Sequence, residues 1–350
     1  MEAVYKYVIR DTQRVIDALK LLNNMDKGSA RTLFVVNEKQ EMVGTLTDGD
    51  IRRKLIEGID ISAIVSSVMN KNYCSLQNDN ISVSLIHLYK EKGIALLPIL
   101  NNDKNIVDVI NLNQQKSYLP IDAVLMAGGK GERLRPLTEK TPKPLVKVAN
   151  KAIIDYNIER LISYGVKNIN VTVNYLGEQL EDHFSSPIND IKIECVREPK
   201  YLGTIGSIQF VKEFQNDTIL VMNSDLFTNI DYEDFYLHFK EHDAAMSVAA
   251  VPYTVSVPFG IFELEGRNIQ GIKEKPVYNY YANAGIYLIK KSMLNYIPQN
   301  TFFNATDLIN ILVREHMKVV RFPITGYWID IGQHTDLKKA QELVKHIKYV

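Results

Sequence analysis

Short apolar runs separated by polar turns dominate about the first 118 residues of the chain. This pattern predicts strand–turn–strand hairpins. Residues 33–47 read as one such hairpin. Residues 97–111 repeat this pattern 64 positions later, with apolar residues at the positions that match apolar residues of the first hairpin. Amphipathic helical spacing precedes each hairpin, over residues 15–22 and 83–88. The repetition predicts two copies of one α+β unit, which pack on each other because neither copy buries its apolar face alone.

After Pro120 the pattern changes to apolar strands that alternate with helical segments. The expected strands cover residues 121–126, 169–173, 191–196 and 218–222. Such alternation predicts an α/β fold with a mostly parallel sheet and helices on both of its faces. Ligands of these sheets bind at the carboxyl ends of the strands, so the loops that leave the strands are candidate sites.

Composition narrows the class of protein. The 350 residues are 46% hydrophobic and 23% charged, which suits two or three globular domains. Equal numbers of basic and acidic residues, 41 each, disfavour a nucleic-acid partner, and no apolar run approaches membrane-spanning length. The two cysteines, Cys74 and Cys195, form neither a metal motif nor a disulfide framework. Without a signal-peptide pattern at the start, we expect a cytoplasmic protein with no membrane partner.

A glycine-rich segment, Gly128-Gly129-Lys130-Gly131, directly follows the strand at 121–126. Glycines let backbone amides approach an anion, and residues 128–151 add seven Lys or Arg against two Glu. Within this stretch Lys143 lies between two prolines, which restrict its backbone. A flexible turn beside a solvated basic segment is the simpler interpretation, but the combination favours a phosphate site. The spacing fits neither a P-loop nor the dinucleotide fingerprint, which disfavours an oxidoreductase.

The residues from Leu125 to Thr138, together with Thr141-Pro142-Lys143-Pro144-Leu145, resemble the signature of the sugar-1-phosphate nucleotidyltransferases. The resemblance covers about residues 121–345, with Glu132 where the family more often has Thr. It implies a Rossmann-like, GT-A-like domain over residues 121–350. In the implied reaction, a sugar 1-phosphate and a nucleoside triphosphate give a nucleotide sugar and pyrophosphate. Such a reaction gathers negative charges, which Mg²⁺ and carboxylates at strand ends would manage.

The resemblance also implies roles for individual residues. Catalytic residues would be Arg133, Lys143 and Asp225, and the metal ligands would be Asp225 and Asp330. The nucleotide would contact Ala127, Gly128, Gly129, Gly131, Glu132, Arg133, Lys143, Gly203 and Thr204. The sugar phosphate would contact Gly260, Glu274, Lys275 and Asn283. Each short segment could also be a turn or a helix cap, and it is their order along one chain that favours the functional interpretation.

The base preference rests on fewer residues. Family members that use thymidine often carry a Gln and an Asp-Gly-Leu near residues 201–205, whereas this chain has Leu202-Gly203-Thr204. With the segment from Trp328 to Gly332, this loop is more similar to the mannose-1-phosphate guanylyltransferases. We therefore predict GTP, with mannose or an amino sugar such as glucosamine. The alternatives are UTP, CTP or dTTP, or a nucleotide-sensing protein with an inactive transferase part.

Residues 43–52 of the first repeat resemble a CBS domain, and the two repeats over residues 1–118 resemble a CBS pair. This resemblance implies a regulatory or assembly unit that binds a purine nucleotide effector and joins chains into a homo-oligomer. Thr47 and Asp50 would bind the ribose. Equally, Asp50 could cap the helix that follows. The second repeat has Asn111 and Gln114 at the matching positions, so at most one nucleotide site is expected.

Overall fold

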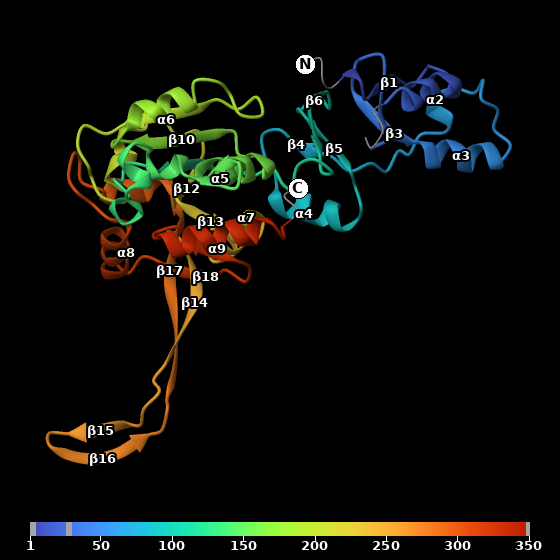
Figure 1. Cartoon of the computed structure of the whole chain (residues 1–350). Helices are drawn as coiled ribbons and strands as arrows, with labels where there is room; N and C mark the ends of the chain where they lie inside the picture. Colours follow the sequence, from blue (N-terminus) through green and yellow to red (C-terminus); the bar gives the residue numbers. More distant parts are fainter. Residues whose placement is uncertain (1–4, 26–29, 348–350) are drawn as a thin grey trace. The chain divides into compact units, whose positions relative to one another are not determined.

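The computed structural model describes residues 5–25 and 30–347, and the chain divides into two units (Figure 1). One unit contains Met1–Leu119 and Ser163–Gly165, and the other contains Pro120–Ile162 and Val166–Val350. Among the described residues, no helix is both long and apolar enough to cross a membrane.

The first unit contains two sheets with the same strand order. In the first, β1 (Val8–Arg10) pairs parallel to β2 (Thr32–Val36), which pairs antiparallel to β3 (Met42–Thr47). In the second, β4 (Leu76–Gln77), β5 (Leu96–Leu100) and β6 (Ile106–Asn111) repeat these directions. The helices are α2 (Val15–Asn23), α3 (Asp48–Ile56) and α4 (Val83–Glu91), with a short 3₁₀ helix at Val65–Ser67. The hairpin strands of the two copies start and end 64 positions apart, as the repeat predicts.

The two copies share a hydrophobic core. Phe34 and Met42 of the first copy are buried in one cluster with Leu96 and Leu100 of the second. In addition, the amide of Met42 donates to the carbonyl of Lys104 over 2.9 Å. Burial of apolar surface between the copies therefore stabilises the pair as one body.

The second unit is built on a seven-stranded sheet with the order β11-β10-β7-β12-β17-β14-β18. Its strands are β7 (Asp122–Met126), β10 (Asn168–Val173), β11 (Ile193–Arg197), β12 (Thr218–Asn223), β14 (Met246–Ser256), β17 (Val277–Lys290) and β18 (Val319–Pro323). Only β17 runs antiparallel to its neighbours in this sheet. The predicted mostly parallel α/β sheet is therefore confirmed, with the glycine-rich segment leaving central strand β7.

Helices and short elements complete this unit. The α-helices are α5 (Ile153–Ser163), α6 (Gly177–His183), α7 (Tyr232–Glu241), α8 (Ala305–Arg314) and α9 (His334–Val344). Short strands are β8 (Lys147–Val148), β9 (Lys151–Ala152), β13 (Leu226–Thr228), β15 (Ile261–Glu265), β16 (Asn268–Lys273) and β19 (Trp328–Asp330). Short 3₁₀ helices lie at Glu132–Leu134, Leu137–Glu139, Lys143–Leu145, Gly206–Phe210 and Lys291–Tyr296.

Strands β14 and β17 continue past the point where β18, which pairs with β14, ends. The last pair between β14 and β18 is Ala250 with Pro323, while β14 and β17 stay paired as far as Ser256 and Val277. Residues 251–282 therefore form a two-stranded ribbon, with β15 and β16 at its far end (Figure 1). We call this segment the distal ribbon. Its apolar side chains are exposed; the exposed fraction of Phe259, for example, is 71%.

Candidate active site

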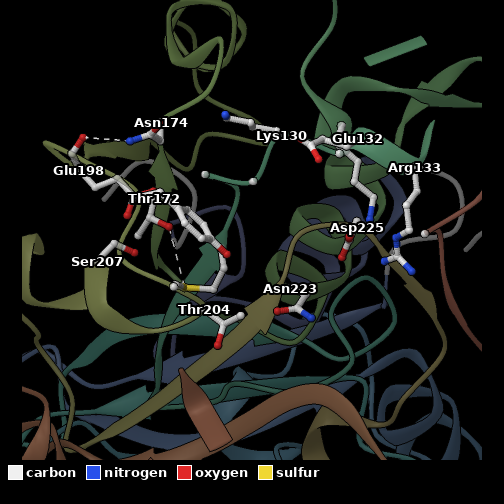
Figure 2. Close-up of a pocket in the computed structure, with 18 of the residues that line it drawn as sticks. Lys130, Glu132, Arg133, Thr172, Asn174, Glu198, Thr204, Ser207, Asn223 and Asp225 are labelled. Carbon is white, nitrogen blue, oxygen red and sulfur yellow. Dashed lines mark hydrogen bonds and ion pairs between the residues drawn. The ribbon is translucent and has the colours of Figure 1, made fainter. Parts of the chain in front are cut away.

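A cavity of about 720 Å³ opens at the carboxyl ends of the central strands (Figure 2). Its walls come from the glycine-rich segment after β7 and from the segments that follow β10, β11, β12 and β19. Most residues that the sequence assigns to nucleotide and metal line this cavity: Gly128, Gly129, Gly131, Glu132, Arg133, Lys143, Gly203, Thr204, Asp225 and Asp330. Residues up to about two hundred positions apart therefore share one wall, because the parallel strands end at the same edge of the sheet.

Two glycines in this segment let its neighbours approach closely. Gly131 has a φ of 62°, in the left-handed region, and a Cβ there would lie 3.0 Å from the Cβ of Lys143. The hydroxyl of Thr138 donates to the carbonyl of Gly131 over 2.8 Å. At Gly128 a side chain would collide with the carboxylate of Glu198. The glycines thus bring the backbone of Lys143 and the side chain of Glu198 to the same loop.

A small sheet brings the two predicted metal ligands together. Asp225 follows β12 and precedes β13, and β13 pairs antiparallel to β19 so that Leu226 lies opposite Asp330. The amide of Ile331 donates to the carbonyl of Asp225 over 3.1 Å. The buried side chain of Asn157 in α5 donates to the carbonyl of Leu226 over 2.8 Å. Backbone pairing and a buried amide therefore position both carboxylates.

Lys143 lies between these carboxylates. Its ammonium donates a hydrogen bond to Asp225 and lies 3.9 Å from Oδ1 of Asp330. The exposed fractions of the side chains of Lys143, Asp225 and Asp330 are 13%, 18% and 42%. Burial and the neighbouring Asp225 raise the pKa of Asp330, whereas Lys143 and Arg133 oppose this rise. The cluster therefore combines a carboxylate pair with a cation that partly compensates its charge.

The donor set fits a divalent cation that brings further ligands with it. No group of three or more His, Cys, Asp or Glu side chains in the described residues could enclose a metal ion. Oδ1 of Asp330 is buried and accepts no hydrogen bond within the described part of the chain. Mg²⁺ takes about six oxygen ligands and often combines one or two carboxylates with phosphate oxygens and water. Asp225 and Asp330 suit that role.

Glu198 lies at the other end of the cavity. It begins the loop over residues 198–207, which by its resemblance is expected to approach the nucleoside, but the sequence predicted no role for the Glu198 side chain. It follows β11, its exposed fraction is 4%, and its Oε2 accepts the amide hydrogen of Leu202 over 3.2 Å. Burial raises the pKa of Glu198 to about 7, opposed by the Leu202 hydrogen bond. Figure 2 shows Glu198, with Asn174 and Ser207, on the side of the cavity away from Arg133 and Asp225. The sequence signal that could have identified Glu198 is its position directly after the strand β11.

Two of the predicted nucleotide contacts have structural partners of their own. Ala127 is buried, and its amide donates to the carbonyl of Thr172 over 3.0 Å, so it does not line the cavity. The hydroxyl of Thr204 accepts a hydrogen bond from the amide of Ala305 over 2.9 Å. Thr204 thereby joins the cavity wall to the start of α8, and its contact with a nucleotide stays a prediction.

The predicted sugar residues lie apart from the cavity lining. Gly260, Glu274 and Lys275 belong to the distal ribbon, where a Cβ at Gly260 would lie 2.9 Å from Oε2 of Glu274. Asn283 lies at the base of this ribbon, where its Nδ2 donates to the Tyr287 hydroxyl over 2.9 Å. The structure brings Gly260 and Glu274 together, but none of the four predicted sugar residues lines the cavity that holds Asp225 and Asp330. Their role in sugar binding stays a prediction.

In the first unit, Thr47 and Asp50 bond to each other. The amide of Thr47 donates to Oδ2 of Asp50 over 2.9 Å, and the amide of Asp50 donates to Oγ1 of Thr47 over 3.2 Å, which is a capping box at the start of α3. Arg53 also donates to Oδ1 of Asp50 over 2.6 Å. Asp50 therefore caps α3 in the structure, which is one of the two roles that the sequence left open. At the matching Asn111 the chain makes a turn, in which the amide of Gln114 donates to the Asn111 carbonyl over 3.0 Å.

Comparison with known families agrees with this architecture. The family model described as nucleotidyl transferase matches residues 122–346, which is more than half of the chain. The chain therefore belongs to the nucleotidyl transferase family, and the resemblance seen in the sequence is confirmed. The model of the CBS domain matches residues 6–57, within the first unit.

Individual relatives cover the same part of the chain. The bifunctional protein GlmU of Methanocaldococcus jannaschii is 33% identical over 230 residues, which cover 63% of this chain and 54% of that protein. Mannose-1-phosphate guanyltransferase beta-B of Xenopus laevis is 29% identical over 223 residues, which cover 61% of this chain and 62% of that protein. The chain thus spans little more than half the length of these curated relatives. The crystal structure of HddC from Yersinia pseudotuberculosis has a TM-score of 0.51 and 26% identity, and the match covers 64% of this chain and 99% of that one.

Proposed function

We propose that this chain transfers a nucleotidyl group, preferably from GTP, to a hexose or hexosamine 1-phosphate in the presence of Mg²⁺. The observation that carries the proposal is that the two ends of the cavity are lined by different kinds of side chain. Lys143, Arg133 and the carboxylate pair line one end, and the buried Glu198 lines the other. This arrangement suits a nucleotide with its phosphates at the charged end and its base near Glu198.

In the proposed reaction, an oxygen of the sugar phosphate attacks the α-phosphorus of the triphosphate in line. The bond from the α-phosphorus to the bridging oxygen breaks, and pyrophosphate leaves. Arg133 and Lys143 would compensate the charge that develops on the leaving group. Mg²⁺ held by Asp225 and Asp330 would supply further charge neutralisation. No covalent intermediate with the protein is needed, and the pKa of Cys195, raised by burial to about 11, makes that thiol a poor nucleophile.

Glu198 favours guanine on chemical grounds. An ionised carboxylate accepts two hydrogen bonds, and guanine offers two adjacent donors at N1 and N2, whereas uracil and thymine offer one donor between two carbonyl oxygens. A protonated Glu198, or a Gln there, would instead suit a pyrimidine. The guanyltransferase name of the Xenopus relative and the structure of HddC with GMP-PN, whose chain is 25% identical, support the same choice. Mannose and glucosamine 1-phosphates are the sugars to test first.

A competition experiment tests this proposal. Equal concentrations of GTP, UTP, CTP, ATP and dTTP are supplied with Mg²⁺ and one sugar 1-phosphate at a time, and the nucleotide sugars are identified by mass spectrometry. The proposal expects GDP-sugar to dominate, and Glu198→Gln to shift the products toward UDP- or dTDP-sugar. A GTP preference that survives Glu198→Gln would remove Glu198 as the base-reading residue. Binding of GTP without product from any sugar would instead favour a nucleotide-sensing protein.

We further propose that the first unit binds a purine nucleotide through Thr47 and Asp50 and takes part in homo-oligomer assembly. The match to the CBS domain family and the position of both side chains at the start of α3 support it. A ligand there would have to displace the bonds of the capping box. Calorimetric titration of the full chain with AMP and GMP, beside Asp50→Ala, tests the binding. Sedimentation of the full chain and of residues 121–350 tests the assembly.

A further inference from the structure

The position of Lys143 sets a condition on metal binding. Its ammonium contacts the carboxylate of Asp225 and lies 3.9 Å from Oδ1 of Asp330, in the space between the two proposed metal ligands. Only 13% of this side chain is exposed, so water screens the charge of Lys143 weakly. An ammonium and a divalent cation in that space would repel each other strongly. The pair can therefore accept a divalent cation only after the ammonium has moved.

The cavity offers the ammonium a second place. The backbone of Lys143 begins the short 3₁₀ helix Lys143–Leu145, in which the amide of Val146 donates to the carbonyl of Lys143 over 3.1 Å. Movement is therefore confined to the four-carbon stem, which is flexible in lysine. Both Lys143 and the glycine-rich segment line the same cavity. An ammonium that leaves the carboxylates can thus stay in the cavity and meet an anion bound at that segment.

We propose that Lys143 is an internal counter-ion, which occupies the cation position between Asp225 and Asp330 until a nucleoside triphosphate draws the ammonium onto its phosphates. This proposal rests on the proposed function. It assigns Lys143 a task in the free protein in addition to the phosphate contact expected from the sequence. The affinity of the carboxylate pair for metal then depends on the nucleotide.

Linkage gives this arrangement a measurable consequence. If the nucleotide raises the affinity for metal by some factor, the metal raises the affinity for nucleotide by the same factor. Part of this gain in metal affinity comes from phosphate oxygens that bind the metal. The other part arises because the nucleotide draws the competing ammonium of Lys143 away from the carboxylates. Removing the charge of Lys143 should therefore strengthen metal binding in the free protein and weaken the coupling to the nucleotide.

The test uses Mn²⁺ as the probe, with free Mn²⁺ followed by electron paramagnetic resonance. The full-length chain and the variants Lys143→Met, Lys143→Arg and Lys140→Met are titrated with and without the α,β-methylene analogue of GTP. Lys140 is an exposed lysine of the same segment and does not line the cavity, so it controls for charge alone. Without the analogue, Lys143→Met should bind Mn²⁺ at least about tenfold more tightly than wild type. Lys143→Arg and Lys140→Met should bind it as weakly as wild type.

With the analogue, the gain in Mn²⁺ affinity should be at least about tenfold larger in wild type than in Lys143→Met. Equal Mn²⁺ affinities of wild type and Lys143→Met without nucleotide, within about twofold, would overturn the proposal. If Lys143→Met does not fold, as judged by circular dichroism, Lys143→Gln takes its place with the same expectations. These titrations need no turnover. A protein that couples metal to the analogue as described but forms no nucleotide sugar would contradict the proposed function alone.

Discussion

The cavity lined by Lys143 and the carboxylate pair, which we propose as the nucleotide side of the site, is built in the opposite way to the distal ribbon, although both belong to the second unit. This cavity lies where buried strands end, and the pairing of β13 with β19 places Asp225 and Asp330 next to each other. The distal ribbon carries Gly260 and Glu274 on two strands with exposed apolar side chains such as Leu264, whose exposed fraction is 63%. One region is held by the packed sheet, and the other only by the pairing of two strands.

This difference indicates how firmly the protein positions the groups that would bind each of the two proposed substrates. A site fixed by backbone pairing is preorganised, so its charged groups can act without reorganisation of the chain. Residues on a two-stranded ribbon gain little support from a core and must be positioned by something else, such as the substrate itself. We therefore expect variants of the nucleotide side to affect the chemical step and variants of the ribbon to affect the use of sugar phosphate.

The largest effect is expected at the carboxylate pair. Asp225→Asn and Asp330→Asn should each lower kcat/KM for the triphosphate by roughly a thousandfold or more, or about 4 kcal/mol, because each removes a proposed metal ligand. Steady-state kinetics at saturating Mg²⁺ measures this loss, and thermal unfolding shows whether the fold survives. Asp182→Asn, on the exposed face of α6, is the matched control and should keep its activity. Near-normal turnover in a folded variant would remove that aspartate from the metal site.

Glu198 should affect stability in a pH-dependent manner. Burial raises the pKa of Glu198 in the folded protein to about 7, so between its unfolded pKa of about 4.3 and 7 the native state binds more protons than the unfolded state. The free energy of unfolding should therefore fall as the pH rises through this window.

Glu198→Gln, which cannot ionise, should be more stable than wild type at about pH 8, by at most about 4 kcal/mol, and equal to it near about pH 4. Urea unfolding at both values measures the difference. Parallel pH profiles of variant and wild type would show that this carboxyl group is not the buried acid described above.

On the distal ribbon, Glu274→Gln should raise KM for the sugar 1-phosphate by roughly ten- to a hundredfold, because a charge-assisted hydrogen bond is lost. KM for the nucleoside triphosphate should not change. Glu265→Gln is the control, since Glu265 lies on the same ribbon and accepts a hydrogen bond from Gln270 over 2.9 Å. If Glu274→Gln changed the KM values for both substrates, or for neither, Glu274 would not be a residue that binds the sugar phosphate.

The smallest effect is expected in the first unit. Its first repeat has a capping box at Thr47 and Asp50, whereas its second repeat has only a turn at the matching Asn111 and Gln114. Asp50→Ala removes half of the capping box and should lower the free energy of unfolding by about 1 kcal/mol. Asn111→Ala, at the matching turn of the second repeat, loses one exposed hydrogen bond from the amide of Asn113 to Oδ1 of Asn111 and keeps the backbone bonds to the Asn111 carbonyl, so it should cost less. Chemical denaturation of both variants tests the order, and an equal loss would contradict the assignment of the cap.

Much of this organisation is readable from the sequence because it depends on local patterns. The 64-residue repeat, the strand before the glycines and the resemblance around Lys143 all correspond to elements in the structure. The burial of Glu198 was not readable, since it depends on how the segment after β11 packs against Gly128. The position of the distal ribbon was not readable either, because it follows from β18 ending at Pro323 while β14 and β17 continue as a pair.

Phosphorus NMR of the complete reaction follows the fate of each phosphorus atom of GTP. GTP, Mg²⁺ and the sugar 1-phosphate that reacts fastest in the competition experiment are followed together. If the protein transfers a nucleotidyl group to the sugar phosphate, the α-phosphorus passes into a nucleotide sugar while the β- and γ-phosphorus atoms appear together as pyrophosphate, in equal amounts and only when sugar phosphate is present. Release of orthophosphate from the γ-position, or pyrophosphate formed without sugar phosphate, would contradict such a transfer.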